Sequence, residues 1–339
     1  KHPGSVSLLP VIGAFGGGNP CILKPSEHTP AVSSAFAKYV PKYFEKGAFQ
    51  VVEGGVEETT ELMQHHWGLC FFTGSERVGK IIHASAAKTL TPTILELGGK
   101  SPTIVSEDCP DDMTVVCNRI IWSKLLNCGQ TCVAIDYILC HNSKVDEFTK
   151  KAIESIERMF GKNPIDSEFG RIVTENHAKR LVDLIQEIEE KNSGDIVYGG
   201  SKTCHVKTKY VAPTIVLSPS KESRLMKEEI FGPILPIVTY DTDEEAISFI
   251  QKMEGTPLAL YAFTKSQERF EKYMRCCPSG TAVRNDAVIQ FIIPNGPFGG
   301  LGTSGIGTYQ GKASFDVFTH PKVVVYHMCH AAFEYFGIR

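Results

Sequence analysis

Three features are missing from this chain of 339 residues, and each absence excludes a class of protein. No uninterrupted apolar run approaches the roughly 18 residues that a membrane-spanning helix needs, and residues 1–10 lack the layout of a signal peptide. No Asn-x-Ser/Thr acceptor is present, and the eleven cysteines are odd in number and irregularly spaced, which argues against a secreted disulfide framework. We therefore expect a soluble, cytoplasmic protein whose cysteines are mostly reduced thiols.

An excess of charge of either sign is also missing. The chain has 35 Lys plus Arg and 38 Asp plus Glu, which gives a formal net charge of −3. Proteins that bind nucleic acid or a membrane surface usually carry an excess of positive charge, which this balance lacks, so a small-molecule partner is expected. At roughly 150 residues per domain, the length predicts about two domains.

The first hundred residues have the pattern of βαβ units. Short apolar runs at 21–23 and 69–72 predict buried parallel strands, and the second run leads into a helix predicted over 76–87. Ligands of open parallel sheets bind at the carboxyl ends of the strands. The loops that follow these strands, 24–27 and 73–75, are therefore the expected places for chemistry.

Beyond Lys100 the predicted helices are longer and amphipathic. Apolar side chains repeat at helical spacing through 145–159 and 181–188, and Thr242 with Glu245 forms a capping-box pattern before a third helix. Further strands are predicted at 137–140, 210–216, 233–240 and 258–263. We expect a second α/β domain, with the boundary just after Gly98-Gly99-Lys100.

A glycine and a serine, Gly74 and Ser75, stand where the second strand turns into its helix. A glycine there lets the backbone approach a ligand, and the exposed N–H groups of a helix start favour an anion such as a pyrophosphate. The spacing is not the full G-x-G-x-x-G fingerprint, and a glycine with a serine is also an ordinary helix start. Both interpretations stay open from the residues alone.

The segment Asn127-Cys128-Gly129-Gln130-Thr131-Cys132 follows a predicted helix and suits a loop that presents a thiol in a cleft. The thiolate is the reactive form, so its neighbours must lower the thiol pKa or supply a base. The alternative is that these cysteines, like most of the eleven, are small buried hydrophobes. A metal pair of Cys128 and Cys132 is a poor third choice because no second pair with finger-like spacing follows.

A carboxylate lies between two leucines in Leu95-Glu96-Leu97, at the end of a predicted strand. Apolar surroundings disfavour its charged form and raise its pKa, which suits a general base that works near neutrality. The alternative is a solvent-facing residue of an alternating strand. Two further segments, 228–233 and 297–305, are each consistent with turn chemistry alone.

Six motifs, taken together and in order, resemble the aldehyde dehydrogenase superfamily. They are Leu23-Lys24-Pro25-Ser26-Glu27, Phe72-Thr73-Gly74-Ser75, Leu95-Glu96-Leu97-Gly98-Gly99-Lys100, Gly129-Gln130-Thr131-Cys132, Glu229-Ile230-Phe231-Gly232-Pro233 and Pro297-Phe298-Gly299-Gly300. The cysteine segment and the strand Ala259-Leu260-Tyr261-x-Phe263 look most like the class 3 branch, which oxidises fatty and aromatic aldehydes. The resemblance runs from Lys1 to about Pro321, and the family's first hundred or so residues are missing, so we expect an N-terminally incomplete chain.

This resemblance implies an α/β architecture with a Rossmann-like coenzyme domain over 1–99 and a catalytic α/β domain over 100–306. A C-terminal oligomerisation segment over 307–339 is implied too, and members of this branch are usually paired as homodimers. The implied coenzyme is NAD or NADP, the substrate is an aldehyde from lipid metabolism, and no metal is implied.

The resemblance also implies roles for single residues. Cys132 matches the nucleophile, and Glu96 matches the base that activates the hydrolytic water. The implied coenzyme positions are Lys24 and Glu27 at the adenosine ribose, Gly74 and Ser75 at the pyrophosphate, and Glu229 and Phe231 at the ribose and nicotinamide side.

Three positions depart from the family's pattern. Lys1 stands where the family has its oxyanion asparagine, Ile135 replaces a usual proline, and Cys128 replaces a small alanine or serine. Lys1 and the missing N-terminal region motivate one alternative to an active dehydrogenase, and use of the same thiol without a coenzyme gives a second. One is a catalytically impaired homologue that acts as a binding or dimerisation partner, and the other is a cysteine hydrolase that cleaves esters without a coenzyme.

Overall fold

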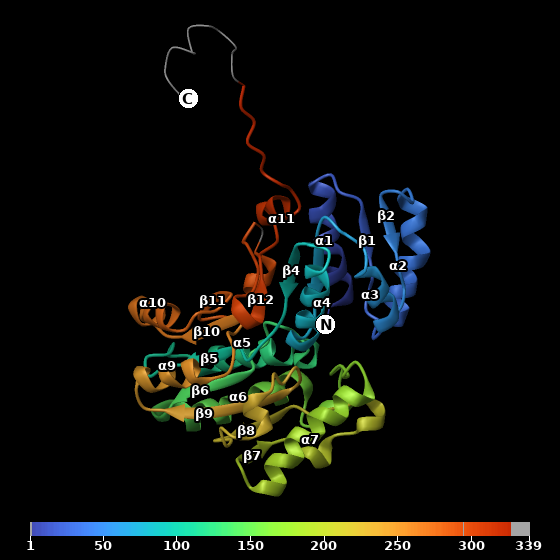
Figure 1. Ribbon diagram of the computed structural model, residues 1–339. Coiled ribbons are helices and arrows are strands. Elements are labelled where there is room, and N and C mark those ends of the chain that lie inside the picture. The colour runs from blue at the N-terminus through green and yellow to red at the C-terminus, as the bar shows by residue number, and fades with distance from the viewer. Residues whose placement is uncertain (1, 294, 327–339) are drawn as a thin grey trace, which may run out of the picture.

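A computed structural model describes residues 2–293 and 295–326 (Figure 1). Within these residues the largest sheet has the strand order β11-β10-β5-β6-β9-β8-β7, and every neighbouring pair is parallel except β7 with β8. Its strands are β5 (Pro102–Val105), β6 (Tyr137–His141), β7 (Asp195–Tyr198), β8 (Thr214–Leu217), β9 (Ile234–Tyr240), β10 (Ala259–Phe263) and β11 (Thr281–Arg284). The predicted α/β class is confirmed.

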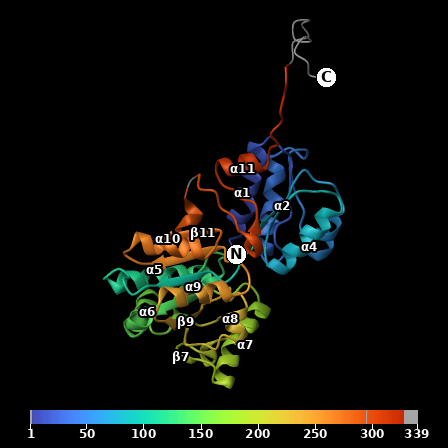
Figure 2. The ribbon, with the colours of Figure 1, turned by 60° about the vertical axis from the view of Figure 1, so that its left-hand side comes forward.

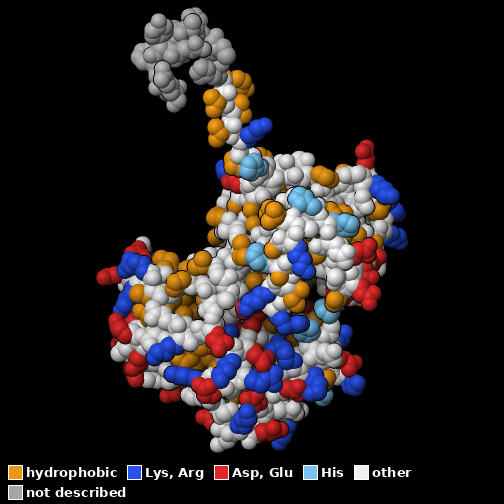
Figure 3. Space-filling model, in the orientation of Figure 1, with side chains coloured by type: hydrophobic (Ala, Val, Ile, Leu, Met, Phe, Trp, Pro, Cys, Tyr) orange, Lys and Arg blue, Asp and Glu red, His pale blue; other side chains and the backbone are white. Residues whose placement is uncertain are grey.

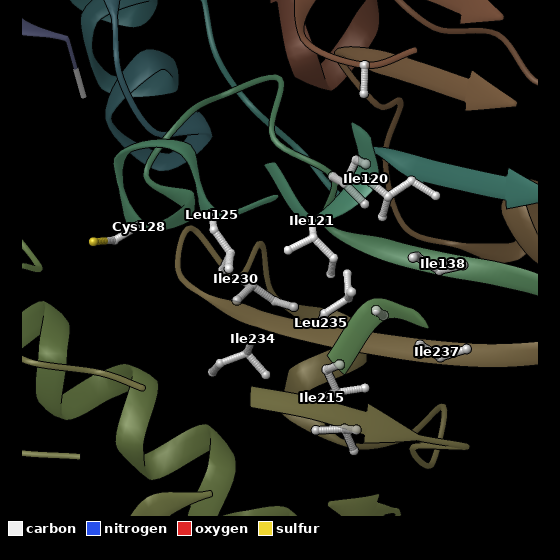
Figure 4. Packing of buried hydrophobic residues seen from close by; sticks show 14 of the residues in the cluster. Ile120, Ile121, Leu125, Cys128, Ile138, Ile215, Ile230, Ile234, Leu235 and Ile237 are labelled. Atoms are coloured by element: carbon white, nitrogen blue, oxygen red, sulfur yellow. The ribbon is translucent and has the colours of Figure 1, made fainter. Parts of the chain in front are cut away.

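Helices cover both faces of this sheet, as expected for parallel strands that are buried on both sides. Ile138 and Cys140 of β6 pack against helices α5, α6 and α7, whereas Tyr137 and Leu139 pack against α9 and α10. Figure 4 shows the first of these clusters at close range. The helices are α5 (Met113–Leu125), α6 (Val145–Phe160), α7 (Glu175–Lys191), α9 (Asp243–Lys252), α10 (Gln267–Cys276) and the short α8 (Arg224–Lys227).

The three amphipathic helices predicted after Lys100 are confirmed. The apolar stripe of α6 buries Phe148, Ala152 and Ile156, and that of α7 is buried likewise. Helix α9 starts after Thr242, whose Oγ1 accepts a hydrogen bond from the Glu245 N–H at 3.3 Å. The cap and the stripe agree, so local signals alone set these elements.

The strand predicted at 210–216 is shorter than expected. The chain enters it from a turn in which Lys209 has a φ of 57°, and Tyr210 makes only an isolated bridge with His205. Pro213 has no N–H to give to a neighbouring strand. Regular pairing therefore begins at Thr214, and the strand ends at Leu217.

The first hundred residues form two small sheets that lie apart from the large one (Figures 1 and 2). β1 (Cys21–Leu23) pairs parallel with β2 (Phe49–Val51), and β3 (Cys70–Thr73) pairs parallel with β4 (Thr93–Glu96). β12 (Gly305–Ile306) returns to pair antiparallel with β4. The helices here are α1 (Pro3–Gly16), α2 (Pro30–Tyr43), α3 (Val56–Leu62), α4 (Glu76–Ala87) and α11 (Lys312–Val317).

The predicted parallel pairing of these strands is confirmed, but their predicted burial is wrong. Ile22 in β1 is 38% exposed, and each residue of β3 is only partly buried. Both strands line a cleft, and each also contributes side chains to a small apolar cluster. Among the described residues, no helix combines the length and the apolar character that crossing a bilayer requires.

Candidate active site

A cleft of about 2410 Å³ is lined by residues of both the small sheets and the large sheet. This exceeds the roughly 300–1,000 Å³ of a pocket for one drug-sized ligand. Seven of the eight residues singled out from the sequence line it: Lys24, Glu27, Gly74, Ser75, Cys132, Glu229 and Phe231. The eighth, Glu96, is 2% exposed at the end of β4. The alternative interpretation, a solvent-facing Glu96, is therefore wrong.

The start of helix α4 faces this cleft. Ser75 caps the helix by accepting the Val78 N–H at 3.4 Å, so the helix-start interpretation is confirmed. It also lines the cleft, and the anion-binding interpretation stays a prediction. A Cβ added to Gly74 would lie 2.4 Å from the Phe72 ring. Any side chain at this position would require the Phe72 ring to move.

An ammonium and a carboxylate follow β1 at the cleft. The Lys24 Nζ donates to the Gly54 carbonyl at 2.8 Å and lies 3.4 Å from Glu27 Oε2. Partial burial opposes ionisation of Glu27, but hydrogen bonding to its own backbone N–H and the charge of Lys24 outweigh this and lower its pKa. Near neutrality the site presents an ionised carboxylate beside a fixed ammonium, a pair that suits the hydroxyl groups of a sugar.

The chain before Cys132 passes through three consecutive left-handed residues after α5. Asn127, Cys128 and Gly129 have φ values of 53°, 55° and 73°. A Cβ on Gly129 would lie 2.3 Å from the Gly232 carbonyl oxygen, so a glycine is required there. Left-handed non-glycine residues cost energy and gather at functional sites, where the surroundings hold them in place.

The buried side chain of Gln130 fixes this turn. Its Oε1 accepts the Val173 N–H at 2.9 Å, and its Nε2 donates to the carbonyls of Asn127 and Arg171 at 3.0 and 3.2 Å. The Ala134 N–H then donates to the Thr131 carbonyl at 2.9 Å and closes a turn around Cys132. Sequence reasoning missed this role, although Gln130 is part of the motif that pointed to Cys132.

The N-terminal end of the described chain touches the same turn. His2 Nε2 lies 3.2 Å from Thr131 Oγ1, one residue before Cys132. Lys1, which the sequence places at the family's oxyanion position, lies outside the described residues.

The two cysteines of this segment differ in their access to the cleft, which only Cys132 lines. Both belong to the core cluster in which Figure 4 labels Cys128, and burial raises the pKa of the Cys128 thiol to about 12. Cys132 is 9% exposed and lines the cleft. Within the described part of the chain no cluster of three or more His, Cys, Asp or Glu is suited to a metal ion.

Tyr309 links the two proposed catalytic side chains. Burial raises the pKa of its hydroxyl, and charges on Glu96 and Cys132 raise it further. Both groups are therefore within electrostatic reach of one phenol. Gly305 of β12 lies opposite Glu96 in the antiparallel pairing of β12 with β4.

A buried ion pair, which sequence reasoning did not find, joins three segments of the site. The Lys100 ammonium pairs with Asp136 and also donates to the carbonyls of Leu225 and Glu228, each at 2.9 Å. The second Asp136 oxygen accepts the Ile230 N–H at 2.9 Å. This pair ties the segment after β4 and the end of the Cys132 loop to the loop that carries Glu229.

Two more groups pack around Glu229. A Cβ on Gly98 would lie 2.4 Å from Glu229 Oε1, so the carboxylate rests directly on the glycine backbone. The Lys124 side chain is buried nearby, and burial lowers its pKa to about 8 although Asp136 and Glu229 oppose the shift. Glu229 thus lies at the wall of the cleft, against Gly98 and within electrostatic reach of Lys124.

Comparison with known proteins identifies a family for residues 2–324. The family model described as "Aldehyde dehydrogenase family" matches residues 2–324. The chain is 41% identical over 323 residues to aldehyde dehydrogenase family 3 member A2 of Pongo abelii, covering 95% of this chain and 64% of that protein. It is 42% identical over 321 residues to the dimeric, NADP-preferring aldehyde dehydrogenase of Mus musculus, covering 94% and 68%.

A solved structure agrees with these relatives. The substrate-bound state of Staphylococcus aureus AldH superposes with a TM-score of 0.90 at 38% identity, covering 98% of this chain and 74% of that one. This chain spans 64% and 68% of the lengths of the two relatives above. The resemblance to the class 3 branch is supported by the family 3 relatives. The chain belongs to the aldehyde dehydrogenase family.

Proposed function

We propose that this protein catalyses the NAD(P)-dependent oxidation of a fatty or aromatic aldehyde to the carboxylic acid. The observation that carries this proposal is the position of Cys132, which follows three left-handed residues and lies at the wall of a cleft that also presents a helix start and a lysine–glutamate pair. The names of the relatives point to the same chemistry. The comparisons lend no support to an impaired homologue, because the relatives above are named as aldehyde dehydrogenases.

The cleft fits a dinucleotide. Gly74 and Ser75 would face the pyrophosphate at the start of α4, where unpaired N–H groups and the helix dipole favour an anion. Lys24 and Glu27 would hold the adenosine ribose, and Glu229 and Phe231 the nicotinamide side. When bound, the oxidised nicotinamide supplies the hydride acceptor.

The chain's own residues would supply the remaining chemistry. The Cys132 thiolate attacks the carbonyl carbon and forms a thiohemiacetal, and its backbone N–H lies next to the oxygen on which charge develops. Loss of hydride leaves a thioester on Cys132. Glu96 then takes a proton from the water that attacks this thioester, and the acid leaves as the thiol is restored.

The direct test is coenzyme reduction by the purified chain with one medium-chain and one aromatic aldehyde. The proposal predicts NADH or NADPH formation that needs both aldehyde and coenzyme. Ester cleavage that proceeds without coenzyme, with no aldehyde-dependent reduction, would support the cysteine hydrolase instead.

Gly98→Ala should weaken NAD binding about tenfold, because the new methyl group must displace the Glu229 carboxylate on which the glycine now rests. Gly16→Ala is the matched control, since a Cβ there meets no atom within 4 Å and the residue does not line the cleft. Calorimetric titration with NAD measures both variants. If Gly98→Ala and the parent chain bind NAD with equal affinity, the proposed role of Glu229 in coenzyme binding is wrong.

Glu96→Gln should keep a burst of NADH formation while steady turnover falls about a hundredfold, because the glutamine cannot take a proton from the hydrolytic water. Rapid-mixing kinetics separates the two phases. Loss of the burst in a variant whose Cys132 still reacts with a thiol reagent would show that Glu96 acts before the thioester forms.

We also propose that the protein is a homodimer built through its C-terminal segment. Val323, Val324, Val325 and Tyr326 are 89%, 57%, 79% and 93% exposed on a segment that projects from the body (Figure 3). Such an apolar extension is typical of an interaction site, and one relative is named dimeric. Sedimentation equilibrium tests this, because a purely monomeric mass at micromolar concentration would exclude it.

We place the protein in the cytoplasm. The ten cysteines among the described residues are all free thiols, as a reducing compartment requires. Cell fractionation followed by detection of the chain tests this location, and enrichment in a secreted fraction would contradict it.

A further inference from the structure

Tyr261 of β10 lies below the Cys132 loop with its hydroxyl fully engaged. The side chain is completely buried, and the hydroxyl donates to the Val133 carbonyl at 2.6 Å. It accepts hydrogen bonds from Gln290 Nε2 at 2.8 Å and from the Val288 N–H at 3.3 Å. A phenol has one proton and two lone pairs, so all of its hydrogen-bonding capacity is used.

Two costly features converge on this hydroxyl. Val288 has a φ of 69°, which a β-branched residue rarely adopts, and in this conformation its N–H reaches the phenol oxygen. Gln290 is 9% exposed, and its Oε1 has no hydrogen-bond partner among the described residues although its Nε2 donates to Tyr261 and Thr281. Such features persist only where the surroundings enforce them, and they gather at functional sites.

The target of this network is the turn that carries the thiol. Thr131 and Ala134 close that turn, and Cys132 and Val133 are its two central residues. The Gln130 side chain anchors the entry to the turn, and the Tyr261 hydroxyl anchors its third residue. Burial raises the pKa of Tyr261, and a charge on Cys132 contributes to this rise, which places the two side chains within electrostatic reach.

We propose that Tyr261 is a positioning residue for the Cys132 nucleophile, and that Gln290 and Val288 fix the direction in which its hydroxyl donates. This assignment rests on the proposed role of Cys132. The hydroxyl does not touch the substrate. It holds the Val133 carbonyl so that the thiol and the Cys132 N–H keep one orientation toward the aldehyde, and a misplacement of about 1 Å in such a site costs on the order of a hundredfold in rate.

The test compares Tyr261→Phe and Gln290→Met with Tyr240→Phe as a matched control. Tyr240 is also a buried tyrosine whose hydroxyl donates to a backbone carbonyl, that of Val105 at 3.2 Å, but on β9 and β5 rather than at the Cys132 loop. Three quantities are measured for each variant: the midpoint of urea unfolding, the rate of the NADH burst with its KM, and the rate of Cys132 alkylation by iodoacetamide at neutral pH.

Tyr261→Phe is expected to lower the burst rate at least about tenfold with KM changed less than about twofold, and to slow Cys132 alkylation at least about fivefold. Its urea midpoint should be lower than that of Tyr240→Phe, because three buried groups lose a partner instead of one, but both variants should remain folded in the absence of urea. The burst and alkylation rates of Tyr240→Phe should equal those of the parent chain. Gln290→Met should show the same pattern more weakly. The burst and alkylation rates of the double variant should be no lower than those of Tyr261→Phe alone, because Gln290 acts through that hydroxyl.

Burst and alkylation rates for Tyr261→Phe that equal those of Tyr240→Phe would overturn the assignment, as would faster alkylation than in the parent chain. If the rate losses of Tyr261→Phe and Gln290→Met simply multiply in the double variant, Gln290 does not act through the Tyr261 hydroxyl. If the parent chain reduces no coenzyme with either aldehyde, the proposed function fails, and the alkylation rates still decide the role of Tyr261.

Discussion

Cys132→Ser is expected to lower aldehyde-dependent NADH formation at least about ten-thousandfold, the scale on which removing a catalytic nucleophile acts. A serine hydroxyl keeps the size of the side chain, but it is far less ionised than a thiol near neutrality. The turn around Cys132 should persist because its anchors, Gln130 and Tyr261, are unchanged. NAD binding should therefore remain, and calorimetry checks this in the same variant.

Cys128→Ala is the matched control for this prediction. Cys128 lies four residues earlier, in the core, and burial raises its thiol pKa to about 12, so it stays protonated and unreactive at neutral pH. The control should keep turnover within about threefold of the parent chain. In the parent chain, loss of activity with a thiol reagent should follow labelling of Cys132. Loss of activity that follows labelling of a different cysteine would contradict this assignment.

The second large effect is expected for stability. Lys100→Met should destabilise the protein by about 3–5 kcal/mol, because it leaves the Asp136 carboxylate buried without its cation. Two backbone carbonyls, those of Leu225 and Glu228, also lose their donor. The loop that carries Glu229 is then expected to loosen, so coenzyme affinity should fall together with the urea midpoint.

Two comparisons isolate the buried pair. Lys207→Met removes the Lys207–Glu175 pair, whose side chains are 90% and 50% exposed, and should leave the urea midpoint unchanged. The double variant Lys100→Met/Asp136→Leu should recover part of the loss, since the Asp136 carboxylate is then no longer buried without the Lys100 ammonium. A midpoint for Lys100→Met equal to that of Lys207→Met would contradict the account of this pair.

The elements that the sequence predicted well are those whose signals are local. Helix α4 covers 76–87 as expected, because a cap at Ser75 and an apolar face occur within a few residues of each other. The strand at 210–216 was predicted too long, because its apolar residues do not show that Tyr210 pairs with His205 in a turn. Predicting the burial of β1 failed similarly, since a cleft and a core both accept apolar side chains.

The resemblance in six motifs identified the candidate site residues. The residues that hold them in place became visible only in the structure. Lys100 and Asp136 are 36 residues apart, and Tyr261 and Val133 are 128 residues apart. No period or spacing in a single sequence reports such contacts, because only the folded sheet brings β10 beneath the Cys132 loop. A motif can thus reveal which residue reacts without revealing what holds it.

The most direct test of the central claim is the mass of the Cys132 peptide after Glu96→Gln is mixed with aldehyde and NAD and quenched with acid. Oxidation on the thiol forms a carbon–sulfur bond and passes hydride to the coenzyme while a proton is released. The account therefore predicts that this peptide gains the mass of the aldehyde less two hydrogens, and that the gain requires NAD. NADH formation with no adduct on Cys132, or with the adduct on another residue, would contradict it.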